Sequence, residues 1–194
     1  MNSDIIPYCI AAYPTILFVY LFVIHPRAVA KTIGHSAKAW DISPKTEDKI
    51  DKWLFTITHY GILGTIWAQA MFGTNYGHLD LRLLTGAVVA ALGGIFCVKA
   101  QLDMSNSWRM GVIASKDIPL ITNGLFRFSR NPFYVGLLFV FWGLTITTST
   151  VVVLGISITQ TILIHRQVLK EERALISTLH KEYEDYKKVT RRYF

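Results

Sequence analysis

The feature that most constrains this chain is a long apolar run, because residues 133 to 164 are 32 residues without one charged side chain. A helix needs about 20 apolar residues to cross a bilayer core of about 30 Å, since each residue adds about 1.5 Å. The run is therefore too long for one unstrained span and short for two full ones. The polar cluster Thr147-Thr148-Ser149-Thr150 near its middle predicts a tight hairpin of two short helices, at 133–146 and 151–166.

Three further apolar segments, at 5–24, 53–72 and 83–98, have the length of membrane spans. Charged residues make up only 17% of the chain, whereas a soluble domain has about 25%. We therefore predict an all-α integral membrane protein with about five transmembrane helices, forming a single membrane-embedded domain over 1–194. Residues 167–191 are charged but carry apolar side chains at helical spacing, which predicts an amphipathic C-terminal helix continuing the fifth span into the cytosol.

The basic residues favour this span count and give the orientation. Of the 20 lysines and arginines, all but Arg82 lie in alternate connections and in the C-terminal tail, which five spans bring to one face. The positive-inside rule makes that face cytoplasmic and places the N-terminus outside. A lipid bilayer is thus the expected partner, and the net charge of +7 needs no nucleic acid to explain it.

The histidines do not indicate a metal site. His25, His35, His78 and His180 are isolated and have no further ligands at metal-binding spacing. His59 lies inside the second predicted span, where an ionisable residue is a functional candidate. A neutral histidine that hydrogen-bonds to another helix is the favoured interpretation.

Two motifs near the cytosolic face carry the chemistry. The first is Arg130-Asn131-Pro132-Phe133-Tyr134-Val135-Gly136, in which Asn131-Pro132 suits a helix start. The second is the pair Glu171-Glu172, which follows a long apolar span. Acids at a cytosolic helix end oppose the helix dipole, so the pair favours binding of a cationic or hydroxyl-bearing ligand over a solvated pair.

Together these motifs resemble the signature of isoprenylcysteine carboxyl methyltransferases, Arg-His-Pro-x-Tyr-x-Gly followed by a hydrophobic stretch and Glu-Glu. The segments 120–126 and 181–189 are similar to two further stretches of that family. The resemblance covers residues 105–192, and the size and layout look most like short prokaryotic members of archaeal type.

The resemblance implies a methyltransferase that uses S-adenosylmethionine to methylate the carboxylate of a lipophilic, prenylcysteine-like substrate at the cytosolic face. By analogy, the cofactor would bind near 105–192, and the motif-matched residues are Ile118, Pro119, Leu120, Ile121, Gly124, Phe126, Asn131, Pro132, Phe133, Tyr134, Glu171 and Glu172. Either Arg130 or Arg166 would orient the substrate carboxylate. Two departures are Asn131, where the family has His, and Gln167, where it tends to have Arg.

Three alternatives stay open from the sequence. A phospholipid N-methyltransferase would use the same cofactor with an amine acceptor. A nicotinamide-dependent sterol-type reductase has a similar C-terminal motif, but that motif has Asp where this chain has Leu137. A non-enzymatic membrane scaffold is the third alternative.

Overall fold

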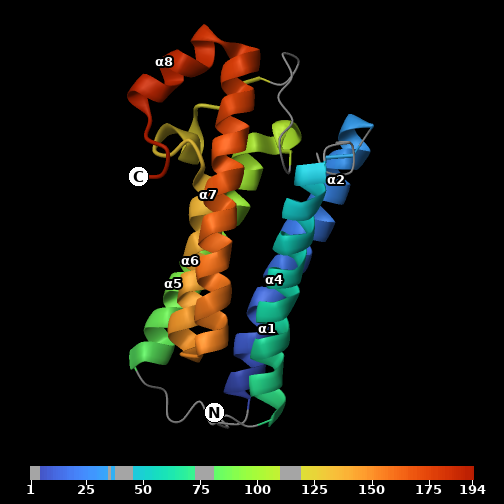
Figure 1. Ribbon diagram of the computed structural model, residues 1–194, viewed down its shortest axis with the longest axis vertical. Coiled ribbons are helices and arrows are strands. Elements are labelled where there is room, and N and C mark those ends of the chain that lie inside the picture. Colours follow the sequence, from blue (N-terminus) through green and yellow to red (C-terminus); the bar gives the residue numbers. More distant parts are fainter. Residues whose placement is uncertain (1–4, 35, 38–45, 73–80, 110–118) are drawn as a thin grey trace.

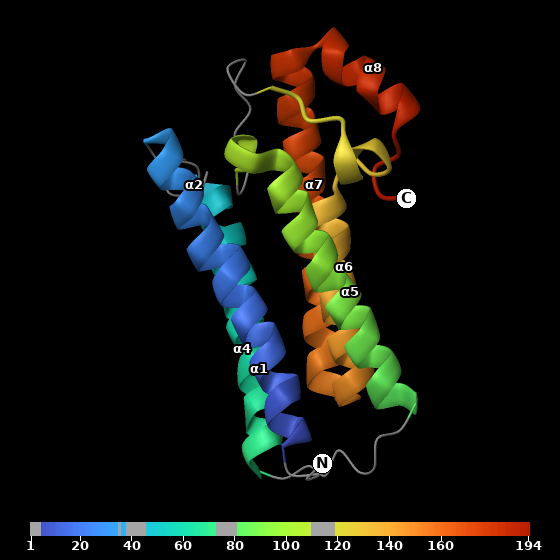
Figure 2. The same ribbon diagram turned by 180° about the vertical axis from the view of Figure 1, so that it is seen from behind.

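The computed structural model describes residues 5–34, 36–37, 46–72, 81–109 and 119–194, and these residues contain helices and no strand. The elements are α1 (Ile6–Val19), a π-helical turn η1 (Tyr20–Ile24), α2 (His25–Ile33), α4 (Thr46–Phe72), α5 (Leu81–Met104), the 3-10 turns η2 (Ser105–Ser107) and η3 (Gly124–Arg127), α6 (Pro132–Thr148), α7 (Val151–Leu179) and α8 (Lys181–Val189). Figures 1 and 2 show α1 and α4 as a pair beside a bundle of α5, α6 and α7, with α8 at one end.

The helices have the lengths and apolar surfaces of membrane segments. Ile6–Ile33, Leu81–Ser107 and Val151–Leu179 are long and apolar enough to cross a bilayer, and α6 is apolar but shorter. α4 is more polar, because five of its first seven residues are charged and it also carries His59 and Gln69. Large apolar side chains stay exposed along the helices. The chain is therefore a multi-pass, all-α integral membrane protein, as predicted.

The predicted hairpin is confirmed. α6 ends at Thr148 and α7 begins at Val151, with Ser149 between them at a φ of 49°. The hydroxyls of Thr147 and Thr148 donate to carbonyl oxygens four residues back, at 2.9 and 2.8 Å. These polar side chains are thus satisfied within the bend, as an apolar environment requires.

Helices α5 and α6 make the closest packing in the molecule, through glycines. A Cβ atom at Gly93 would lie 2.6 Å from the carbonyl oxygen of Gly136. A Cβ atom at Gly143 would lie 2.5 Å from the backbone nitrogen of Ala90. The two backbones touch because these positions have no side chain. This contact fixes the start of α6, and with it the motif around Pro132, against α5.

The first membrane segment is tied to α5 by two hydrogen bonds, one from α1 and one from η1. The Tyr13 hydroxyl donates to the Ala90 carbonyl oxygen at 2.9 Å. In the π-helical turn η1, each carbonyl oxygen accepts the N–H of the residue five positions later. For Leu21 that residue is Pro26, which has no N–H, so the Leu21 carbonyl lacks its helical partner. Gln101 Nε2 donates to that carbonyl at 3.1 Å instead. A fully buried amide on α5 thus completes the hydrogen bonding of the first membrane helix.

The predicted continuous C-terminal helix is wrong in one respect. α7 does extend beyond the apolar run, but the helix breaks at His180, whose φ is 47°. α8 then turns away from the α7 axis, as Figure 1 shows. The turn buries Tyr183 and Tyr186, whose spacing is also compatible with a straight amphipathic helix. Local periodicity could not distinguish the two arrangements, because the same apolar face packs in both.

The glycine contact between α5 and α6 makes a testable prediction. Gly93→Ala should destabilise the protein by about 1–3 kcal/mol, because the methyl group meets backbone atoms that cannot move aside. The measurement is the melting temperature of the detergent-solubilised protein. Gly155→Ala is the matched control, since nothing lies within 4 Å of its added Cβ; it should leave the melting temperature unchanged or raise it. Equal effects of the two substitutions would contradict the proposed packing.

Candidate functional site

The Asn131-Pro132 turn starts α6, and the side-chain amide nitrogen of Asn131 donates two hydrogen bonds. Pro132 is the first residue of α6, where its missing N–H costs no helical hydrogen bond. Asn131 is buried, and its Nδ2 donates to Glu172 Oε1 at 3.3 Å and to the Arg192 carbonyl oxygen at 3.1 Å. The amide thus holds the α6 start to α7 and to the segment after α8.

Arg130 is a buried arginine with its hydrogen-bonding groups in use. Its Nε and Nη2 donate to Glu172 Oε1 at 3.2 and 3.0 Å, and Nη1 donates to the Thr190 carbonyl oxygen at 2.6 Å. The Lys187 carbonyl oxygen lies 3.5 Å from the same Nη1. Only 8% of the Arg130 side chain is exposed. The guanidinium therefore joins three chain segments.

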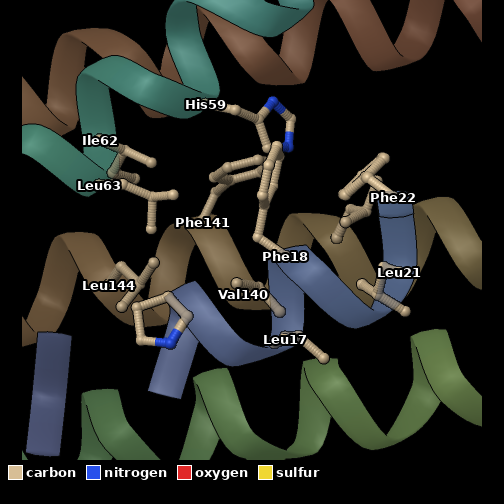
Figure 3. Close-up of a pocket in the computed structure, with 12 residues that line it drawn as sticks. Leu17, Phe18, Leu21, Phe22, His59, Ile62, Leu63, Val140, Phe141 and Leu144 are labelled. Atoms are coloured by element: carbon tan, nitrogen blue, oxygen red, sulfur yellow. The ribbon is translucent and has the colours of Figure 1, made fainter. Parts of the chain in front are cut away.

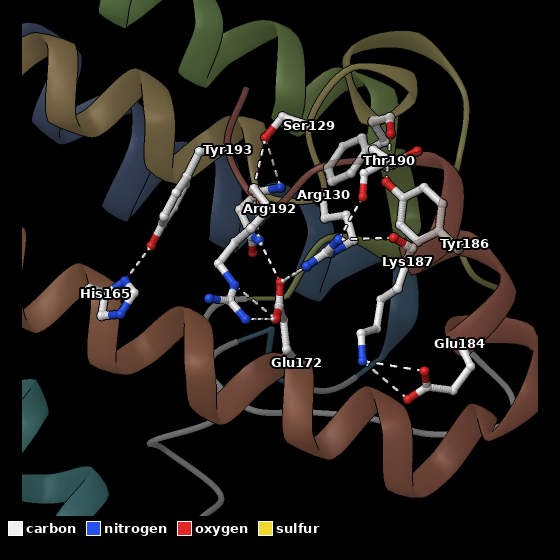
Figure 4. A network of polar contacts seen from close by, with 12 residues as sticks. Ser129, Arg130, His165, Glu172, Glu184, Tyr186, Lys187, Thr190, Arg192 and Tyr193 are labelled. Carbon is white, nitrogen blue, oxygen red and sulfur yellow. Dashed lines mark hydrogen bonds and ion pairs between the residues drawn. The ribbon is translucent and has the colours of Figure 1, made fainter.

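Glu172 lies between two arginines. Arg192 Nε and Nη2 approach Glu172 Oε2 at 3.0 and 2.9 Å, while Arg130 occupies the other carboxylate oxygen. Figure 4 shows this network, with both guanidinium groups directed at one carboxylate. Hydrogen bonds to Glu172 raise the pKa of Arg192 above its ordinary value. The negative charge of Glu172 is thus compensated within the protein.

Glu171 has a different environment. Neighbouring residues on a helix point about 100° apart, so Glu171 faces another side of α7. Its Oε1 accepts hydrogen bonds from the Tyr134 hydroxyl at 2.6 Å and from Gln167 Nε2 at 2.9 Å. Both donors are neutral, and Glu171 forms no ion pair with any other residue that the structure describes. The site therefore contains a positioned carboxylate whose charge is not compensated by a neighbouring cation.

A tight turn brings the loop before α6 against the end of α5. Gly124 has a φ of 58°, and a Cβ there would clash with the Asp103 carboxylate. Asp103 Oδ2 accepts the N–H of Leu125 at 2.9 Å, which fixes the turn. The next residue, Phe126, is buried, and its carbonyl oxygen accepts the Tyr186 hydroxyl of α8 at 2.5 Å. Asp103 and Tyr186 thus position the loop from two sides.

The other predicted loop residues precede this turn in the chain. Leu120 and Ile121 are half-buried, and Pro119 is exposed. Ile118 lies outside the residues that the structure describes.

Arg166 lies apart from Arg130. Its side chain is 58% exposed, and Nη2 lies 3.8 Å from Asp51 Oδ1 on α4. Lys170 Nζ binds the other oxygen of Asp51 at 2.5 Å. Arg130 therefore pairs with Glu172 on α7, whereas Arg166 contributes to the contact between α4 and α7.

The structure also adds residues that sequence analysis missed. Arg192 completes the Glu172 network, and the Tyr193 hydroxyl hydrogen-bonds to His165 Nδ1 at 2.9 Å (Figure 4). In the sequence, Arg192 is one of eight basic residues in the C-terminal tail. Nothing local distinguished it from an orientation signal, because its partner comes from another helix.

His59 makes the predicted contact between helices. Its Nδ1 lies 2.7 Å from the Phe55 carbonyl oxygen and 2.9 Å from Gln160 Nε2 of α7. The ring also borders an apolar cavity between α1, α4 and α6, where Phe18 and Phe141 pack beside it (Figure 3). The interhelical role is confirmed, since the hydrogen bond joins α4 to α7.

No cluster of three or more histidine, cysteine or acidic side chains suited to a metal ion occurs in the part of the chain that the structure describes. The acids of the site are instead bound to arginine, tyrosine and amide groups. Of the two acids, Glu171 is the one that no arginine or lysine of the described residues pairs with.

Comparisons with known proteins agree with this arrangement. The family model described as phospholipid methyltransferase matches residues 81–182, just over half of the chain. The solved structure of the eukaryotic intramembrane Ras methyltransferase ICMT (isoprenylcysteine carboxyl methyltransferase) superposes with a TM-score of 0.70 at 18% identity. That match covers 98% of this chain and 66% of the solved chain. No curated protein matches the sequence.

The chain is a membrane protein with the fold of a solved methyltransferase. The residues that the structure describes contain no soluble nucleotide-binding domain. More particularly, the chain belongs to the phospholipid methyltransferase family. The resemblance to isoprenylcysteine carboxyl methyltransferases, found from short motifs, is confirmed at the level of the fold. The family match also favours methyl transfer over the reductase alternative.

The Glu172 network predicts a large effect of Arg130→Ala on stability. Removing one partner of a buried ion pair leaves a charge without compensation and costs about 3–5 kcal/mol. Thermal unfolding in detergent measures the effect. Lys188→Ala removes one partner of an exposed pair with Asp185 and should leave the melting temperature unchanged. An Arg130→Ala variant with the wild-type melting temperature would show that the network does not hold the site together.

Proposed function

We propose that this protein is an S-adenosylmethionine-dependent methyltransferase that methylates the carboxylate of a lipophilic, prenylcysteine-like acceptor at the membrane. The observation that carries the proposal is the Glu171 carboxylate, held by Tyr134 and Gln167 at 2.6 and 2.9 Å beside the family's motif at the start of α6. We place the site at the cytosolic face, in agreement with the distribution of basic residues in the sequence.

The residues of the site fit this cofactor. S-adenosylmethionine carries an ammonium group and a sulfonium group, and a carboxylate without a protein cation can compensate a ligand's positive charge. Glu171 is such a carboxylate. The half-buried Leu120 and Ile121, the buried Phe126 and the turn from Asn131 to Tyr134 supply apolar and hydrogen-bonding surface nearby. We propose these residues as the binding site, with Glu172 supporting it from the neighbouring helix face.

The proposed reaction needs no general base. The cofactor, when bound, supplies an electrophilic methyl group on a sulfonium. A carboxylate is already ionised near neutral pH, so one of its oxygens can bond to the methyl carbon as the carbon–sulfur bond breaks. The products are a methyl ester and a neutral thioether. Opposite charges disappear during this step.

A site that excludes water assists such a reaction. Two opposite unit charges 4 Å apart attract by about 1 kcal/mol in water and by about 4 kcal/mol at an effective dielectric constant near 20. The chain's contribution would be to hold the two reactants close and in line, which can supply much of the rate enhancement. The half-buried Tyr134–Glu171 hydrogen bond would provide a fixed reference point for that alignment. A lipophilic acceptor would enter from the bilayer, and the polar cofactor from the cytosol.

The family match gives specific support to a second candidate, a phospholipid N-methyltransferase. Its amine acceptor is protonated near neutral pH and must lose a proton before it attacks. Its rate would therefore rise with pH until the amine is deprotonated, whereas the rate with a carboxylate acceptor would not.

Ligand binding tests the cofactor. S-adenosylhomocysteine at about 100 times its dissociation constant should stabilise the detergent-solubilised protein by about 2.7 kcal/mol, and a nicotinamide dinucleotide should not. Glu171→Gln should reduce this thermal shift, because it removes the charge that faces the cofactor. Glu182→Gln, at an exposed position of α8, is the control and should keep the shift. A full shift in Glu171→Gln would contradict the assignment of Glu171.

Methyl transfer tests the acceptor. We expect labelled methyl from S-adenosylmethionine to appear on a small prenylcysteine as a base-labile ester, at a rate that does not increase with pH above 7. Phosphatidylethanolamine is the competing acceptor. A base-stable product on this phospholipid, formed faster at higher pH, would establish the N-methyltransferase instead.

A further inference from the structure

Arg109 and His25 are half-buried polar side chains near Trp108, and each has one buried hydrogen-bonding atom without a partner. Arg109 Nη1 donates to the carbonyl oxygens of Asn106 and Trp108, at 2.6 and 2.8 Å. Its Nε is buried without a partner, and so is Nδ1 of His25. Within the described residues, Arg109 forms no ion pair with a carboxylate. Burial lowers its pKa from the ordinary value, as expected for a cation without a bound anion.

Trp108 connects these two residues to the proposed reaction site. Its side chain is only 2% exposed. The His25 ring packs edge-on against it at a centroid distance of 5.1 Å, and Phe133 lies 6.3 Å away. Phe133 in turn contacts Tyr134 at 5.8 Å, and Tyr134 binds Glu171. The rings of Trp108, Phe133 and Tyr134 thus form a continuous aromatic wall. His25 and Arg109 lie at its Trp108 end, and the Glu171 carboxylate lies at its Tyr134 end.

The other arginines of the site are less suited to an anion. Arg130 already binds Glu172 and two backbone carbonyl groups. Arg166 is directed at Asp51 on α4. Arg192 shares Glu172 with Arg130. Arg109 is therefore a half-buried arginine near the α6 start whose charge no protein carboxylate compensates among the residues described.

We propose that Arg109 and His25 bind the anionic head group of an amphipathic acceptor, with Trp108 as the apolar wall beside it. This inference rests on the proposed function and deepens it, because it assigns the acceptor's charge. The cofactor's positive groups would face Glu171 at one end of the aromatic wall, and the acceptor's negative group would face Arg109 at the other. The anion is a carboxylate in a prenylcysteine and a phosphate in a phospholipid.

The test compares a charged acceptor with its neutral analogue. A prenylcysteine and its carboxamide are titrated against the full chain in detergent; affinity is measured from the thermal shift for both, and also from KM for the prenylcysteine. Arg109→Gln should weaken binding of the carboxylate about 10- to 100-fold, the range of a hydrogen bond to a charged group. Binding of the carboxamide should change less than 3-fold. His25→Phe, which keeps a ring against Trp108, should weaken binding of the carboxylate by about 2- to 10-fold.

Three controls separate the possible causes. Arg27→Gln removes an exposed positive charge two residues from His25 and should leave both affinities unchanged. Arg109→Lys keeps the charge and should retain most of the affinity. The shift given by S-adenosylhomocysteine should be the same in wild type and in Arg109→Gln. Failure of the wild type to bind this ligand would count against the proposed function, while binding of the anionic amphiphile would still test Arg109.

The outcomes are distinct. Equal weakening of the carboxylate and the carboxamide would show that Arg109 acts on folding alone, and would overturn the proposal. Unchanged affinity for every anionic acceptor would overturn it as well. If Arg109→Gln weakens the binding of phosphatidylethanolamine and not that of the prenylcysteine, the bound anion is a phosphate. The anion site is then supported, and the methyl acceptor is the amine.

Discussion

The carboxylate of Glu172, bound by Arg130 and Arg192, is the interaction that holds together the end of the molecule where α8 lies. It joins α7 to the start of α6 and to the segment after α8, which are far apart in the sequence. A buried charge is stable only when it is paired and hydrogen-bonded, so these segments are held together or the charge is left uncompensated. With Glu172 occupied in this way, Glu171 alone of the acidic pair has its charge available to a ligand.

The membrane helices supply the support for this network. The glycines between α5 and α6 let the two backbones touch, and this places the Asn131-Pro132 turn beside the end of α5. Asp103 at that end then fixes the Gly124 turn of the loop. The loop and the helix start are thus positioned by helix packing, and their side chains lie beside the residues proposed for the site. A rigid bundle of this kind can align two reactants that arrive from different phases.

In the proposed site, opposite charges lie at the two ends of the aromatic wall, which suits methyl transfer. Tyr134 and Gln167 hold Glu171 without compensating it. Arg109 and His25 lie along an aromatic wall from it and keep unused donor or acceptor atoms. A site with a free negative charge at one end and a free positive charge at the other can bind a cationic cofactor and an anionic acceptor together. The motif arginine, by contrast, is used within the fold.

The sequence by itself determined the fold class, the hairpin at Thr147–Thr150 and the motifs that mark the site. Those features depend on local hydropathy, on turn residues and on the order of short motifs, which a single chain displays directly. Only the tertiary structure decided that the two glutamates face different sides, that the C-terminal helix breaks at His180, and that Arg130, Arg166 and Arg109 have different partners. An arginine's role depends on which carboxylate or carbonyl group lies within about 3 Å of it, and those groups come from distant parts of the chain.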